Sequence, residues 1–477
     1  MKKFLLPVCF IAIFSNCTNE VSLSDNQTDM STKNDVMDTS NIVSLTDIQT
    51  LIKAKNNTTR NAACQEKDVQ CLEDEEHDTL LYACDEPNGG WTIYSTDKRV
   101  PAIVAQSRSG SFQEYMKNET MALWIEHMAN DMKRIKQTDD KNLSLSEQEI
   151  KQNKEYWESI CQIEKYLNKN GKTRGPIIDP SNPIPATGHY ELTSSYTTEE
   201  VYDSIVHLIP VHWHQNTPFN TYCPYNSTWT KKAYAGCVAI AGAQMLYYLH
   251  ETLGVPTEAP STASCSGNIN NYSMEQGNFN STVWNNMRYN DSYAAPLIAN
   301  VGLLVNTDYG DEGSGANTED LVNHVFANYG ISCTYGNYNA ETIKSNLLSN
   351  LPVIVRADGT KHHILFIVPQ FSDGHAFIID GYKRSRTATH NTYTWVYDAP
   401  VNPNVPRPEI PQTSSTTYTS PSITLFKMNW GWGNSYDYDN VWFAPTGDWI
   451  RVVDEDNGDE LNFEYNRHMI YNFHIAD

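Results

Sequence analysis

The chain has 477 residues, of which 34 are Lys or Arg and 57 are Asp or Glu, and its formal net charge is −23 at pH 7. This length suits two domains with appendages better than one small domain. The acidic balance, with a sequence pI near 4.9, excludes the basic footprint that nucleic-acid binding requires and suits a soluble, exported protein.

The N-terminus predicts an export signal over residues 1–17. Three residues, Met1-Lys2-Lys3, give a positive start, and the apolar run 4–14 is far shorter than the ~18 residues that a membrane-spanning helix needs. The run ends in a sequence that resembles a bacterial lipobox, in which Cys17 is lipidated after signal cleavage. We therefore expect an outer-membrane or cell-surface lipoprotein whose only membrane contact is this lipid anchor. Plain secretion is the alternative, because Asn16 is not the commonest residue before such a cysteine.

Residues 18–44 are rich in Asn, Asp, Ser and Thr, which predicts a disordered tether. Residues 45–170 then read as a small domain of strands and helices, with apolar side chains at helical spacing in the second half. The expected elements are a helix over 42–55, strands over 89–99 and 101–106, and helices over 112–136 and 146–167. Cys64, Cys71 and Cys84 leave a disulfide among them an open question, and their spacing lacks the fourth ligand of a zinc site.

A basic segment rich in Gly and Pro, residues 171–188, predicts a cleavable linker. Residues 189–477 are long enough for one large domain in which helices come first and strands follow, and this segregation predicts the α+β class. The expected helices are 237–252, 317–329 and 340–349, and the expected strands are 353–356, 376–379, 393–397, 425–429 and 469–475.

Cys237 is the candidate nucleophile. It stands at the start of an apolar helix rich in small residues, and the N–H groups and dipole of a helix N-terminus favour a thiolate. A single cysteine on an apolar helix is more often a buried core residue. The catalytic interpretation therefore depends on partners elsewhere in the chain.

Two later segments supply such partners. His375 opens a short apolar strand bracketed by Gly374 and Gly381, and Asn429-Trp430 precedes a Gly-Trp-Gly run. A cysteine protease needs a histidine to take the thiol proton and often an Asn or Asp oxygen to hold the imidazole. Upstream, Gln215 could donate to an oxyanion together with the Cys237 N–H.

With these motifs the chain resembles the streptopain family of cysteine peptidases, which are papain-like bacterial enzymes made as zymogens. The matching stretches are 236–239, 374–381 and 429–433, with further likeness over 298–310 and 313–315. The resemblance covers the chain from about Val201 to its end and is weaker before that. It implies a two-lobed papain-like domain over 189–477, preceded by a smaller α/β inhibitory propeptide domain over 45–170.

The resemblance implies Cys237 as nucleophile, His375 as general base and acid, Gln215 as oxyanion donor and Asn429 as the imidazole orienter. It also implies that the indole of Trp430 shields the histidine's hydrogen bond from water. Less specifically, it implies substrate contacts from Gly313, Ser314, Gly315 and Gly374. The family has endopeptidase activity, with a hydrophobic preference one residue before the scissile position, and uses no metal or organic cofactor. The partners it implies are protein or peptide substrates and the enzyme's own propeptide.

Two departures from the family pattern stand out. Residues 382–427 form a long insertion rich in Thr, Ser, Pro and Asn, which we expect to be a surface excursion between strands. Residues 454–460 are acidic where the family is often Gly-rich, which points to basic or less acidic substrates.

The alternatives to a protease are a catalytically inactive or non-proteolytic surface-binding protein on the same fold, and an acyl-transferring enzyme. The presence of all four residues, Cys237, His375, Asn429 and Gln215, disfavours the binding protein. The long propeptide and the family motifs disfavour the transferase.

Overall fold

The structure is a computed structural model. It describes residues 41–56, 69–86, 89–168, 172–173, 188–225, 231–255, 263–265, 272–274, 281–287, 290–311, 313–357, 375–397, 413–433, 441–445 and 467–476. The export signal with Cys17, most of the tether, most of the linker, Gly374 and the acidic stretch 454–460 lie outside these ranges. Within them, no helix has both the length and the apolarity that crossing a membrane requires.

The N-terminal unit is a four-stranded antiparallel meander with helices packed against it. Its strands are β1 (Val69–Glu73), β2 (Thr79–Asp85), β3 (Trp91–Ser95) and β4 (Ile103–Ser107). Its helices are α1 (Leu45–Asn56), α2 (Phe112–Tyr115), α3 (Glu119–Gln137), the short η3 (Asp140–Asn142) and α4 (Glu147–Asn168). The strands β1 and β2 were not predicted from the sequence. Cys71 lies opposite Tyr82 and Cys84 opposite Val69, so these two cysteines do not face each other across the pair, and Cys64 is outside the described residues.

The helix expected over 112–136 is two helices in the structure. Asn118 interrupts it in an extended conformation, and its side-chain oxygen accepts a hydrogen bond from the Met121 N–H at 2.9 Å. A side-chain acceptor at this position satisfies one of the N–H groups that a helix start leaves unpaired. The break therefore marks a new N-cap and lets α3 take its own direction.

One antiparallel sheet runs through the N-terminal unit and the rest of the molecule. Its order is β1-β2-β3-β4-β14-β13-β11-β10-β15-β9, and the junction is the pair β4 and β14 (Trp442–Phe443), where Trp442 faces Gln106 and Phe443 faces Ala105. The remaining strands are β9 (Ile331–Asn337), β10 (Val353–Ala357), β11 (His375–Tyr397), β13 (Ile423–Asn429) and β15 (His468–Ile475). The N-terminal unit thus adds its strands to the edge of the sheet that carries His375.

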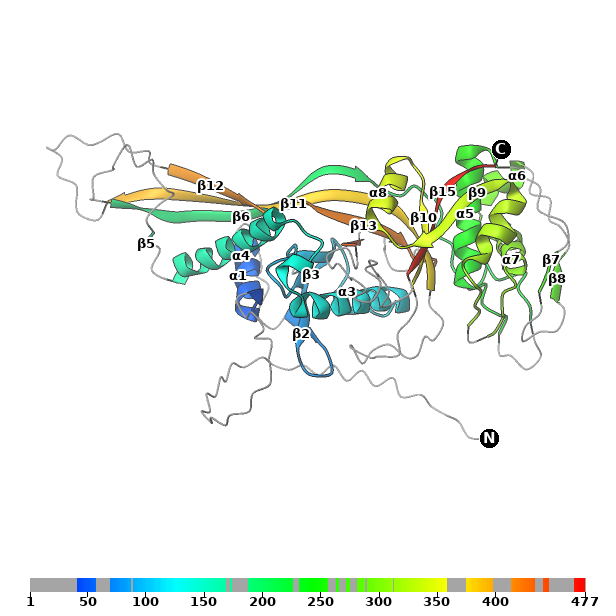
Figure 1. The fold of residues 1–477 in the computed structure, drawn as a ribbon, viewed down its shortest axis with the longest axis horizontal. Coiled ribbons are helices and arrows are strands. Elements are labelled where there is room, and N and C mark those ends of the chain that lie inside the picture. The colour runs from blue at the N-terminus through cyan, green and yellow to red at the C-terminus, as the bar shows by residue number, and fades with distance from the viewer. Residues whose placement is uncertain are drawn as a thin grey trace.

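A long arm extends this sheet away from the body of the molecule (Figure 1). It consists of β6 (Gly188–Ile205), the outer part of β11 and β12 (Thr413–Thr419), with the two-residue strand β5 (Lys172–Thr173) beside β6. The expected surface excursion over 382–427 is therefore, in its described part, mostly regular strand. The strands expected over 393–397 and 425–429 lie within β11 and β13, and the β-branched and aromatic residues of this region favour strands.

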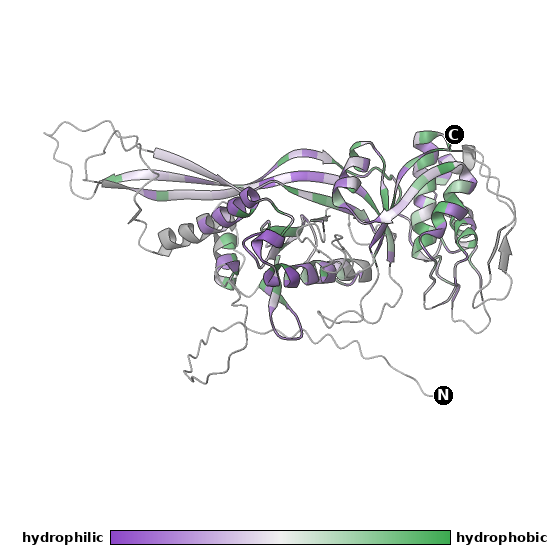
Figure 2. Ribbon diagram, in the orientation of Figure 1, coloured by the Kyte–Doolittle hydropathy of each residue, from purple (hydrophilic) through white to green (hydrophobic). Residues whose placement is uncertain are grey.

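The other lobe is helical (Figure 1). It contains α5 (Cys237–Leu253), α6 (Ser281–Met287), η4 (Asp291–Tyr293), α7 (Ala295–Leu304), η5 (Leu321–Phe326), η6 (Ala327–Tyr329) and the hairpin of β7 (Ala263–Cys265) and β8 (Tyr272–Met274). Figure 2 shows hydrophobic residues concentrated on α5 and α7, whereas the arm is mostly polar or intermediate. The described residues confirm the α+β class.

The central sheet is buried on both faces. Ile354, Ile378 and Ile470 belong to the core that includes α5. Val355 and Phe377 belong to the core that includes α3 of the N-terminal unit and α8 (Ala340–Leu348). Alternate residues of a strand point to opposite faces, so each strand of this sheet contributes to both cores.

Candidate active site

Cys237 is the first residue of α5, and Gly236 before it adopts a φ of 89°. This left-handed conformation favours glycine. A Cβ on Gly236 would also stand 3.4 Å from the carbonyl oxygen of Ser314. The helix itself is buried from Val238 to Leu249, and a Cβ on Gly242 would come within 2.5 Å of Leu321. The small residues noted in the sequence therefore allow α5 to be packed on several sides while its first residue stays at the surface of the lobe.

His375 is the first residue of β11, in the sheet of the other lobe, where it pairs with Ala357 of β10. The Cys237 thiol is hydrogen-bonded to its imidazole. The second imidazole contact joins Nε2 to the backbone carbonyl oxygen of Trp430 at 2.9 Å. A carbonyl can only accept, so Nε2 carries a proton and Nδ1 is left for the thiol. A nucleophile helix in one lobe and a histidine strand in the other is the papain-like arrangement expected from the resemblance.

The surroundings of Cys237 favour its ionised form. Burial alone would raise the pKa of the thiol, but the charge of His375 and the hydrogen bond with it act in the opposite direction. The backbone N–H groups of Ala376 and Val238 add to this effect, and the net result is a lowered pKa for Cys237. By contrast, burial raises the pKa of Cys333 to about 12. Only a thiol of the first kind is reactive near neutral pH.

Asn429 does not hold the imidazole, and this expectation from the sequence is corrected. Its side-chain nitrogen donates to the Val211 carbonyl at 3.0 Å and to the Gln244 side-chain oxygen at 3.2 Å. Its side-chain oxygen accepts from the Gly431 N–H at 3.2 Å. The amide is thus used within the core, and the carbonyl of the next residue, Trp430, reaches His375 instead.

Trp430 lies beside the histidine strand, with its ring centroid 4.7 Å from that of Phe377. The indole that stacks on the imidazole of His375 is that of Trp432. Their ring centroids are 6.0 Å apart, and the angle between the ring planes is 24°. Sequence reasoning missed Trp432 and the Trp430 carbonyl. The repeated Trp-Gly pattern was the available signal, but it does not say which tryptophan contacts the histidine.

Gln215 is buried and lies next to the nucleophile segment, because its backbone carbonyl accepts a hydrogen bond from the Ala235 N–H at 2.9 Å. Its side-chain amide makes no hydrogen bond to any other described residue. An unpaired amide beside the start of α5 can donate to an oxygen that develops negative charge there.

The loop expected to contact substrate lies next to Gly236, near Ser314. Asp308 and Gly315 exchange two backbone hydrogen bonds, and the Ser314 hydroxyl accepts from the Gly310 N–H at 3.1 Å. A Cβ added to Gly313 or Gly315 would meet no atom within 4 Å, so both face open space. The structure brings Gly313, Ser314 and Gly315 to the edge of the site, whereas Gly374 lies outside the described residues.

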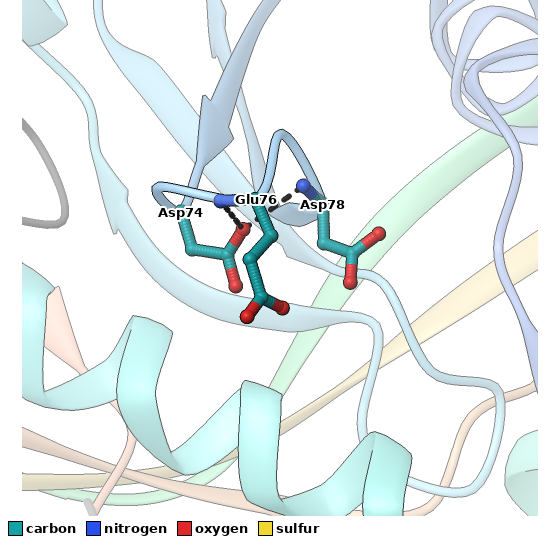
Figure 3. Close-up of side chains that lie close together, drawn as sticks. All are labelled: Asp74, Glu76 and Asp78. Atoms are coloured by element: carbon teal, nitrogen blue, oxygen red, sulfur yellow. Dashed lines mark hydrogen bonds between the residues drawn. The ribbon is translucent and has the colours of Figure 1, made fainter.

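Among the described residues, one cluster of carboxylates is close enough to hold a metal ion. Asp74, Glu76 and Asp78 lie in the turn between β1 and β2, far along the chain from Cys237 (Figure 3). One Asp74 oxygen accepts from the Glu76 and Asp78 N–H groups, each at 3.0 Å. The other oxygen lies 2.7 Å from the Lys133 ammonium. A lysine already supplies the positive charge, and the arrangement accounts for the turn.

Comparisons with known proteins show several likenesses. Residues 213–438 match the model of the Peptidase C10 family. Streptopain of Streptococcus pyogenes is 23% identical over 344 residues, which cover 66% of this chain and 71% of streptopain. A fragment of prointerpain A from Prevotella intermedia aligns with 17% identity and a TM-score of 0.43, over 84% of this chain and 98% of that one. Active interpain A cysteine protease of the same species aligns with 20% identity and a TM-score of 0.33, over 56% of this chain and 94% of that one. The family match and the alignment with streptopain show that the chain is similar to the streptopain-like cysteine peptidases.

Proposed function

We propose that the protein is an exported cysteine endopeptidase, made as a zymogen, in which Cys237 and His375 form a thiolate–imidazolium pair. The observation that carries the proposal is the hydrogen bond between the two side chains, at the start of a buried helix, together with the lowered pKa of Cys237. A binding protein would have no need of a thiol held in this state.

In the proposed reaction His375 Nδ1 already holds the proton of Cys237, and the thiolate attacks the substrate carbonyl carbon. The carbonyl oxygen becomes an oxyanion, to which the Gln215 amide and the Cys237 N–H donate. His375 then gives its proton to the leaving amine as the C–N bond breaks, which leaves an acyl-enzyme. Water, deprotonated by the same imidazole, releases the acid and restores the thiol. Throughout, the Trp430 carbonyl holds Nε2–H and keeps the ring in one orientation.

The substrates are proposed to be proteins or peptides, bound along the loop of Gly313, Ser314 and Gly315. As in the streptopain family, the residue one position before the scissile bond is proposed to be hydrophobic.

The N-terminal unit is proposed to act as the inhibitory propeptide, within the expected boundaries 45–170. Support comes from its contacts with the catalytic sheet: Trp124 of α3 lies 5.6 Å from Phe377 and 6.3 Å from Trp430, measured between ring centroids. The Cys237–His375 hydrogen bond is present with this unit in place. We therefore propose that the propeptide restricts access to the cleft and does not displace His375.

The location outside the cell is proposed from the N-terminal sequence, with Cys17 as the lipid attachment point. Cys17→Ala should move the protein from the membrane fraction to the soluble fraction. Equal partitioning of the variant and the wild type would favour plain secretion.

Digestion of casein tests the enzymatic proposal. Cys237→Ala should abolish hydrolysis while the thermal unfolding temperature stays near that of the wild type. Cys333→Ser is the matched control, because this thiol is also partly buried but has a raised pKa, and it should retain activity. Activity of Cys237→Ala near the wild-type level would show that another group is the nucleophile.

A further inference from the structure

Gln244 is a fully buried amide on the catalytic helix, about two turns after Cys237. Its neighbours along α5 are buried and mostly apolar. An amide in such surroundings costs free energy unless its polar atoms are hydrogen-bonded. The partners of Gln244 are therefore informative about why a polar residue stands there.

The side chains of Gln244 and Asn429 form a buried pair, here called the amide clamp. The Gln244 oxygen accepts from the Trp213 N–H at 3.0 Å and from the Asn429 side-chain nitrogen at 3.2 Å, and the Gln244 nitrogen lies 3.4 Å from the Asn429 oxygen. Asn429 extends the clamp to the Val211 carbonyl and the Gly431 N–H. Backbone N–H groups can only donate and a carbonyl can only accept, so these partners fix the orientation of both amides.

Each of the three segments that meet at the clamp carries one group of the proposed mechanism. Helix α5 begins with Cys237. The segment that contains Trp213 carries Gln215 two residues later. The segment held through Asn429 presents the Trp430 carbonyl, which accepts from His375. The clamp thus joins the nucleophile, the oxyanion donor and the support of the imidazole.

We propose that Gln244 is a positioning residue: through the amide clamp it holds the Trp430 carbonyl and the Gln215 segment in register with Cys237. Gln244 acts through these groups and makes no hydrogen bond to Cys237 or His375. The inference rests on the proposed roles of Cys237 and His375, and it gives Asn429 a place in the site that differs from the one expected from the sequence.

Loss of the clamp should affect turnover and the state of the thiol more than substrate affinity. When the Trp430 carbonyl shifts, Nε2–H loses a well-placed acceptor and the imidazolium opposite Cys237 is less stable. A displacement of about 1 Å at reacting groups can cost on the order of 10²-fold in rate. We expect Gln244→Met to lower kcat by about 10- to 100-fold, with KM changed by less than about threefold, because none of the clamp's hydrogen bonds goes to the substrate loop.

The test replaces one buried amide at the clamp and one away from it. Gln244→Met removes the hydrogen bonds at nearly constant volume. Asn300→Leu is the control, because Asn300 is equally buried, lies on α7 and accepts from the Tyr329 hydroxyl, away from the clamp. In the full-length chain, alkylation of Cys237 by iodoacetamide is followed against pH, with the Cys237 peptide quantified by mass spectrometry. Gln244→Met should raise the pKa of the Cys237 thiol by about one unit, and Asn300→Leu should leave it unchanged.

A folded Gln244→Met protein with the wild-type thiol pKa and kcat would overturn the inference. If that variant does not fold, Gln244→Glu serves instead, since a carboxylate keeps both acceptor bonds and loses only the donation to Asn429. Its kcat relative to that of the wild type at the same pH should be reduced at neutral pH and should partly recover in acid, where the protonated carboxyl can donate again. A wild-type profile for this variant would equally overturn the inference. The proposed function fails separately, if Cys237 of the wild type is alkylated with the pH dependence of an ordinary thiol.

Discussion

The imidazole of His375 is held by the main chain of Trp430, through a hydrogen bond of 2.9 Å from Nε2 to the carbonyl oxygen. A backbone acceptor is present whatever side chain follows Asn429, so the tautomer of the histidine does not depend on one particular side chain. Nearby side chains can still change the position of the Trp430 carbonyl. Substitutions at several residues around Cys237 and His375 should therefore affect activity.

Gln215→Ala is expected to lower kcat by about 10²–10³, the usual cost of losing one oxyanion donor. The thiol pKa of Cys237 should stay at its wild-type value, because the Gln215 amide makes no hydrogen bond to the described residues of the pair. Steady-state kinetics on a peptide substrate and pH-dependent alkylation measure the two effects. Asn216→Ala, at the exposed neighbouring position, is the control and should remain active. A kcat within about threefold of the wild type for Gln215→Ala would remove this residue from the mechanism.

The rate of hydrolysis should follow a bell-shaped pH profile. Because the pKa of Cys237 is lowered, its thiolate persists to lower pH than an ordinary thiolate, and this sets the acid limb. Loss of the His375 proton sets the alkaline limb. His375→Ala removes the main influence that lowers the pKa, so alkylation of Cys237 at pH 6 should slow by at least about tenfold. Equal alkylation rates in variant and wild type would show that the ion pair does not exist.

Acid should destabilise the N-terminal unit through His127 of α3. Burial, with a smaller effect from the Arg467 charge, lowers the pKa of His127 from 6.5 to about 3. Between these two values the unfolded chain binds a proton that the folded chain does not, so the free energy of unfolding falls as the pH drops below about 6.5. This contribution is fully present above pH 6.5.

Thermal unfolding of the Cys237→Ala protein at pH 7 and pH 5 measures this effect. The drop in unfolding temperature should be smaller for His127→Gln than for the parent, since Gln takes up no proton. His324→Gln, at an exposed histidine, should show the parent's drop. If His127→Gln loses as much stability in acid as the parent, other groups are responsible.

Cleavage of the proposed linker should require a second molecule. Strand β6 begins at Gly188 opposite Tyr397, at the end of the 23-residue strand β11 that lies farthest from His375 (Figure 1). At roughly 3.3 Å per residue, this end is about 70 Å from the histidine. Thr173 pairs with Tyr190 near the same end. A chain segment held at Thr173 and Gly188 can reach only about 25 Å from these two residues. This reach is much shorter than the distance to His375 of the same molecule.

The rate of maturation should therefore depend on protein concentration. The half-time of shortening should fall as the concentration rises, and full-length Cys237→Ala should be cut when mixed with active enzyme. A half-time that stays constant over a hundredfold dilution would indicate cleavage within one molecule and contradict this geometry.

The sequence by itself determined the elements whose pattern is local. Cys237 at the start of an apolar helix, His375 at the start of a strand and the helical periodicity around Trp124 each depend on neighbours within a few turns, and the structure has α5, β11 and α3 at these places. The α+β class followed from the order of such segments. The extent of regular strand in residues 382–427 was not predicted, because Thr and Ser suit both loops and exposed strands, and pairing with β6 and β12 stabilises the strand.

Only the tertiary structure decided which group completes the site. Asn429, Trp430 and Trp432 are adjacent in sequence, and a pattern cannot tell which of them presents an oxygen to His375. That choice depends on where the Asn429 amide finds partners, and these are Val211 and Gln244, about two hundred residues earlier in the chain. Hydrogen bonds between segments so far apart form only when the two lobes pack together, because each buried amide must then be satisfied by whatever the other segments present.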